Sequence, residues 1–64
     1  MWTTVYVASR YELAVQIKNS LLEEGFMIEV EYFGEDKGEE LYEILAPGAE
    51  AEDIQSYMME NGII

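Results

Sequence analysis

Residues 26–33 read FMIEVEYF, and their side chains alternate with a period of two. A β-strand points successive side chains to opposite sides of its sheet, so this stretch predicts a strand with one buried side. One set of positions is wholly apolar and the other mixes apolar groups with carboxylates: Phe26, Ile28, Val30 and Tyr32 in the first, Met27, Glu29, Glu31 and Phe33 in the second.

A further strand is expected after a polar loop. Residues 34–40 are polar and contain two glycines, which predicts a hairpin connection longer than the minimum. Residues 41–46 read LYEILA and end at a Pro-Gly pair, which is typical of a strand that stops there. Because Glu43 should point to solvent, we expect Tyr42 and Ile44 to point inward.

Two amphipathic helices accompany these strands. Ser9 and Glu12 have the spacing of a capping box, in which each side chain bonds the backbone amide of the other. The helix that follows should end at Gly25, which suits the left-handed position after a helix. A second helix over 49–61 begins with acidic residues, which favour the N-terminal end of a helix dipole. The expected inner stripes are Leu13, Ala14, Ile17, Leu21 and Leu22 in the first helix, and Ala51, Ile54 and Met58 in the second.

An uncharged strand over 3–8 completes the order β-α-β-β-α, and Ile63-Ile64 would add a short final strand. Short connections and right-handed crossovers leave few topologies for this order. We predict an α+β fold over the single domain 1–64, a ferredoxin-like β-α-β-β-α(-β) two-layer sandwich. Its antiparallel sheet has the 41–46 strand in the middle, both helices on one face, and the final stub beside the first strand.

The uncovered face of this sheet is the candidate site. With Val5 and Val7 pointing inward, the outward positions carry more large apolar groups than a routine surface does. These interface or ligand candidates are Trp2, Thr4, Tyr6, Met27, Phe33, Leu41 and Leu45. The first strand has no charge, whereas Glu29 and Glu31 protect the second, so we predict a homodimer through the first strand's edge or the open face. A charge introduced at Tyr6 should weaken that dimer.

The charge balance narrows the classes of partner and chemistry. The chain has 3 Lys+Arg against 14 Asp+Glu, a formal net charge of −11, and no His or Cys. This composition opposes binding to nucleic acid or to anionic membranes and excludes disulfides and thiolate metal sites. The first ten residues lack the features of a signal peptide, so a cytoplasmic protein is expected. We expect no enzyme, cofactor or bound metal, because no acidic pair has the apolar flanks that tune a catalytic pKa.

The leading hypothesis for function is a regulatory module that binds a protein or a small effector. Other readings of the sequence remain open. The loop from Glu35 to Glu40 could hold a divalent cation, although its spacing differs from an EF-hand. The negative charge could bind a basic partner, or it could only keep the protein soluble. An RNA-recognition module shares the element order, but the 41–46 strand lacks its basic-aromatic motif.

Several stretches carry a resemblance to a known family: Trp2, Val5–Ala8, Ala14, Ile17-Lys18, Leu21–Phe26, Tyr42–Pro47 and Glu50-Ala51. On these residues the chain resembles a small bacterial family described as prokaryotic signal-transducing proteins, domains of unknown function related in fold to nitrogen-regulatory PII proteins. The resemblance implies a ferredoxin-like fold, a cytoplasmic setting and a regulatory binding role, and it supplies no catalytic or ligand residues. Two features depart from the family: Gly48-Ala49 replaces a polar helix cap, and acids replace bases in the second strand and hairpin. The second departure argues against an anionic effector such as a nucleotide.

Overall fold

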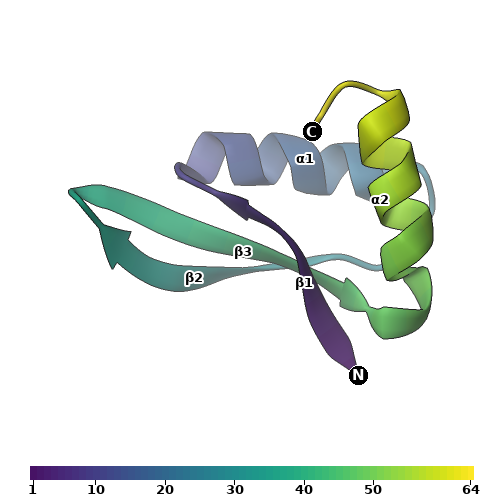
Figure 1. Ribbon diagram of the computed structural model, residues 1–64, viewed down its shortest axis with the longest axis horizontal. Coiled ribbons are helices and arrows are strands. Elements are labelled where there is room, and N and C mark those ends of the chain that lie inside the picture. Colours follow the sequence, from purple (N-terminus) through teal and green to yellow (C-terminus); the bar gives the residue numbers. More distant parts are fainter.

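The computed structural model describes residues 1–64 and shows an α+β protein with a three-stranded antiparallel sheet and two helices (Figure 1). The elements in chain order are β1 (Trp2–Ala8), α1 (Tyr11–Glu23), β2 (Glu29–Asp36), β3 (Glu39–Pro47), a 3-10 turn η1 (Gly48–Glu50) and α2 (Ala51–Glu60). Neither helix combines the length and the apolar character needed to cross a membrane.

β3 is the middle strand of the sheet, as the sequence predicts. The strand order is β1-β3-β2, and both outer strands pair with β3 in the antiparallel sense. α1 packs across all three strands, and α2 contacts β1. Buried residues of both helices share one core with Ile44 of β3, and both helices lie on the same side of the sheet (Figure 1). This arrangement is compatible with a small two-layer sandwich.

The core between the helices and the sheet contains no buried polar or charged side chain. Its buried members are Val5, Ala8, Ala14, Ile17, Leu21, Ile28, Ile44, Ala46, Ile54 and Met58. The helix stripes predicted from the sequence are confirmed except at three positions, because Leu13 and Ala51 are half-buried and Leu22 is 43% exposed. Leu22 lies about 100° around the helix from Leu21, which takes the inward position.

A β-bulge at Val5 reverses the facing of the second half of β1. Thr4 pairs with Leu45 and Tyr6 pairs with Ile44, so Val5 is the extra residue between them. Residues directly opposite each other share a face of the sheet, and Tyr6 therefore lies on the helix side with Ile44. The predictions that Tyr6 points outward and Val7 inward are wrong: Tyr6 is half-buried against the core, and Val7 is 44% exposed.

The β2–β3 hairpin has a tight turn instead of the longer loop expected over 34–40. The ladder continues to the Asp36–Glu39 pair, which leaves two residues in the turn. Lys37 (φ 53°) and Gly38 (φ 85°) both have positive φ, the backbone that a two-residue turn needs to match the strand twist. β2 also begins later than expected, at Glu29, and a bulge at Phe33 interrupts its pairing.

The helix ends follow the expectation at their C-termini but not at the N-terminus of α1. The predicted capping box is wrong: α1 begins at Tyr11, and its N-cap is Arg10 without a side-chain capping bond. Both helices end in a Schellman motif, since the N–H of Phe26 donates to the Leu21 carbonyl and the N–H of Ile63 to the Met58 carbonyl.

The expected fourth strand does not form. Gly62 has a φ of 72° and turns the chain back after α2. The hydrogen bond from Ile63 to Met58 is 2.8 Å long, and Ile63 packs on the core. The motif that ends α2 therefore directs the last residues toward the helices, and the free edge of β1 stays uncovered by them.

Candidate functional site

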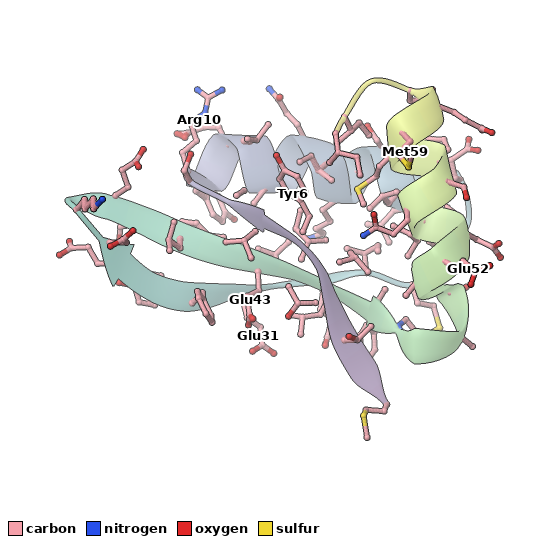
Figure 2. All side chains as sticks on the ribbon, in the orientation of Figure 1. Tyr6, Arg10, Glu31, Glu43, Glu52 and Met59 are labelled. Carbon is pink, nitrogen blue, oxygen red and sulfur yellow. The ribbon has the colours of Figure 1, made fainter.

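The face of the sheet opposite the helices is the candidate site, here called the open face. The ladder places on it Trp2, Thr4 and Val7 of β1, Glu29 and Glu31 of β2, and Leu41, Glu43 and Leu45 of β3. Figure 2 shows Glu31 and Glu43 directed away from the helices and Tyr6 directed toward them. No helix or loop of the chain packs over this face (Figure 1).

The apolar part of the open face is formed by β1 and the middle strand. Trp2 is 42% exposed and Val7 is 44% exposed, while Leu41 and Leu45 are half-buried between the outer strands. Thr4 lies beside Leu45 and its hydroxyl donates to the Glu43 carboxylate over 2.9 Å. The structure therefore places Trp2, Thr4, Leu41 and Leu45 on the same face of the sheet, as expected from the sequence.

Of the other candidates, Tyr6 and Met27 lie elsewhere. Tyr6 faces the helices, so a charge at Tyr6 would disturb packing and does not test the open face. Met27 is 58% exposed and precedes β2, where its N–H donates to a Glu50 carboxylate oxygen over 2.9 Å. Phe33 is 57% exposed and is the bulge residue of β2. Val7 was missed because alternation from Val5 places it inward, and a bulge leaves no signal in that pattern.

Carboxylates give the open face a strongly negative character. Glu31 of β2 lies directly opposite Glu43 of β3, and Glu29 lies opposite Leu45. No strand of the sheet contains a Lys or Arg. Like charges directly opposite each other destabilise a strand pair, so a cation brought by a partner would relieve this repulsion.

The two edges of the sheet are protected in different ways. The β2 edge carries acidic side chains along its length, as the sequence predicts. The β1 edge has no charged residue, but the Val5 bulge interrupts it, and the Val5 carbonyl accepts a hydrogen bond from Gln55 Nε2 over 3.1 Å. Only the short stretches on either side of Val5 are open to a second strand.

A shallow cavity of about 270 Å³ lies between α1 and the C-terminal residues, lined by Leu13, Gln16, Ile17, Ser20, Gly62 and Ile63. None of these side chains titrates, so they cannot act as a general acid or base. No group of three acidic residues is gathered so as to hold a metal ion, and the Glu35–Glu40 hairpin is drawn out as a strand pair.

Comparison with known proteins found no matching family model, no similar curated protein and no similar solved structure. The open face combines exposed apolar groups with carboxylates that have no base beside them.

Proposed function

We propose that this chain is a non-enzymatic binding module with a regulatory role, and that it contacts a protein partner through the open face of its sheet. The observation that carries the proposal is the uncovered apolar strip of Trp2, Val7, Leu41 and Leu45 beside the carboxylates of β2 and β3. Apolar groups gathered on an uncovered face of a domain are a mark of contact surfaces.

The proposal includes a homodimer whose interface is the free edge of β1. A face-to-face dimer would bring Glu29, Glu31 and Glu43 of one copy against the same carboxylates of the other, with no base on either sheet. The β1 edge carries no charge, so two copies can approach there without repulsion between facing carboxylates. The open face then remains free for a different protein or a small effector.

The ferredoxin-like assignment and the cytoplasmic setting are also proposals. The order β1-α1-β2-β3-α2 with β3 in the middle of the sheet supports the assignment. A fourth strand would occupy the β1 edge in that fold, which is the edge that the C-terminal residues leave uncovered. Both proposals accord with the resemblance to bacterial signal-transducing proteins, which implies a regulatory role.

The test measures the absolute mass by light scattering at physiological salt together with the fluorescence of Trp2, the only tryptophan. We expect a dimer whose Trp2 emission stays that of a solvent-exposed indole. Leu45→Ser on the open face and Leu22→Ser on α1 form a matched pair, and neither should change the mass. A dimer that shields Trp2 and is dissociated by Leu45→Ser alone would show that the open face is used for self-association. A monomer would remove the dimer from the proposal.

A basic partner is the second candidate, and the Glu31–Glu43 pair favours it. A partner with Lys or Arg beside an apolar group would cover the leucines of β3 and neutralise both carboxylates. The expected signature is binding that weakens steeply as salt is raised. Binding that is insensitive to salt would contradict it. For the alternative of a divalent cation, the structure gathers no group of three His, Cys, Asp or Glu residues.

A further inference from the structure

Three tyrosines meet on the helix side of the sheet, away from the open face. The ring centroids of Tyr11 and Tyr42 are 5.4 Å apart with an interplanar angle of 64°, and those of Tyr32 and Tyr42 are 5.7 Å apart at 66°. Tyr11 is the first residue of α1, while Tyr32 and Tyr42 are directly opposite each other on β2 and β3. One helix and two strands therefore build a single aromatic surface, here called the tyrosine cluster.

The outer rings of the tyrosine cluster are open to solvent. Tyr11 is 58% exposed and Tyr32 is 59% exposed, with half-buried Tyr42 between them. The cause is the hairpin, which projects beyond the start of α1 (Figure 1), so no helix covers this end of the sheet. The side-chain hydrogen bonds of the protein involve Thr4, Glu50, Gln55 and Asn61, and none uses a hydroxyl of the cluster. Rings and hydroxyls are both available to a partner.

Carboxylates surround the cluster without a nearby cation. Glu40 lies two residues before Tyr42 on β3 and so on the same face, and Glu35 is its partner across the ladder. Desolvation and the negative charge of Glu40 raise the pKa of the Tyr42 phenol above its ordinary value, and Glu12 contributes in the same direction. These carboxylates therefore act on the phenol of Tyr42.

The protein's own bases do not occupy this surface. Arg10 precedes Tyr11 in the chain, but its side chain is directed away from the hairpin (Figure 2). Lys37 is in the turn, five residues before Tyr42 in the chain. Five residues of extended chain span about 16 Å, so Lys37 is far from the Tyr42 ring. Neither Arg10 nor Lys37 is therefore a partner of the aromatic and acidic groups.

We propose that the tyrosine cluster and Glu40 bind an arginine side chain of a protein partner. A guanidinium is planar, stacks on the face of a tyrosine ring and donates paired hydrogen bonds to a carboxylate, so it uses both kinds of group at once. A lysine ammonium can take the same charge but cannot form the stacked and forked arrangement. A second copy of this chain brings its own charge of −11 and is a poor source of this cation. The site lies on the opposite side of the sheet from the open face and stands independently of the proposed function.

The test titrates the full chain with the capped peptide acetyl-Gly-Arg-Gly-amide and follows the ring resonances of the tyrosines by NMR. The same peptide with citrulline in place of arginine has nearly the same shape without the charge and should not bind. The lysine peptide should bind more weakly than the arginine peptide. No binding of the arginine peptide, or equal binding of the citrulline peptide, would overturn the proposal.

Matched variants separate the site from general attraction to an acidic protein. Tyr32→Leu removes one exposed ring without changing the charge and should weaken binding roughly two- to five-fold, the worth of an exposed cation–π contact. Phe33→Leu is its control, because Phe33 is the next residue and is 57% exposed. Equal affinity of Tyr32→Leu and wild type, or an equal loss in Phe33→Leu, would count against the site.

Glu40→Gln should weaken binding, whereas Glu23→Gln at the end of α1 removes the same charge and should leave it nearly unchanged. Equal losses in these two variants would mean diffuse electrostatic attraction only, which also overturns the proposal. Tyr32 and Glu40 are exposed, so both variants should fold, and backbone NMR spectra verify this. Trp2 on the open face should not respond to the peptide, so this site and the proposed function can fail separately.

Discussion

Ile44 and Leu45 are neighbours in the middle of β3, yet they face environments that differ in every respect. Ile44 is fully buried under the helices, in a core without a polar side chain. Leu45 is half-buried on the open face, between Thr4 and Glu29. Around Ile44 the helix side is closed by packing, while around Leu45 the open side keeps apolar groups beside charge and has no helix over it. One strand therefore supplies both the stability of the domain and its candidate site.

The largest expected effect comes from truncating these two neighbours. Ile44→Ala removes a fully enclosed side chain and should lower the free energy of unfolding by about 2–5 kcal/mol. Leu45→Ala should cost about 1 kcal/mol or less, because its surroundings are already half open. Urea unfolding followed by circular dichroism measures both. Similar losses in the two variants would mean that the open face is covered in solution.

The next largest effect concerns the bulge at Val5. Tyr6→Lys places an ammonium against the core and should lower the free energy of unfolding by about 2 kcal/mol. Val7→Lys faces Glu43 across the ladder and should be neutral or stabilising, by about 0.2–1 kcal/mol. Thermal unfolding of these two variants at low salt shows which of the two side chains points toward the helices. The reverse order of stabilities would restore the regular alternation expected from the sequence.

A smaller effect is expected from the carboxylates on the open side. Glu31→Gln removes the like-charged partner of Glu43 and should raise the free energy of unfolding by about 0.2–1 kcal/mol. Added salt screens the same repulsion, so the melting temperature of the wild type should rise with ionic strength. The rise should be smaller in Glu31→Gln. A melting temperature that stays flat from low to high salt would show that self-repulsion does not limit stability.

The smallest expected effect on stability is that of Tyr42. This residue lies on the helix side of the sheet, where the hairpin projects beyond α1 (Figure 1). Desolvation, then Glu40, raises the pKa of its phenol, so folding favours the protonated form. This contribution to stability is complete below the unfolded-state pKa of about 10 and is lost as the pH rises through the higher folded-state pKa. We expect Tyr42→Phe to reduce the loss of stability in alkaline solution, measured by urea unfolding at several pH values around 10. An identical pH dependence in both proteins would contradict the assignment.

Much of the fold follows from local pattern. The spacing of Ala14, Ile17 and Leu21 predicts the buried stripe of α1, and Ile54 and Met58 do the same for α2. The glycine after each helix indicates where that helix ends, because a left-handed residue there suits glycine best. The element order and short connections predict the middle place of β3 in the sheet.

The candidate site was predictable only in part. Trp2, Thr4, Leu41 and Leu45 lie on the same face of the sheet, as alternation along each strand predicts. Tyr6 and Val7 exchange sides because a single extra residue in the ladder shifts all later positions, and strand propensity carries no mark of it. The tyrosine cluster joins residues from three elements, so no periodicity within one segment could reveal it.

The sequence by itself determined the two helices, the three strands, the apolar stripes that form the core and the negative charge of the whole chain. These properties depend on residue type and on spacing within a single segment. Only the tertiary structure decided the Val5 bulge, the tight turn at Lys37-Gly38, the return of Ile63 onto the core and the meeting of the tyrosines. Each of these depends on how one segment pairs or packs with another, and that free energy exists only once distant parts of the chain are in contact.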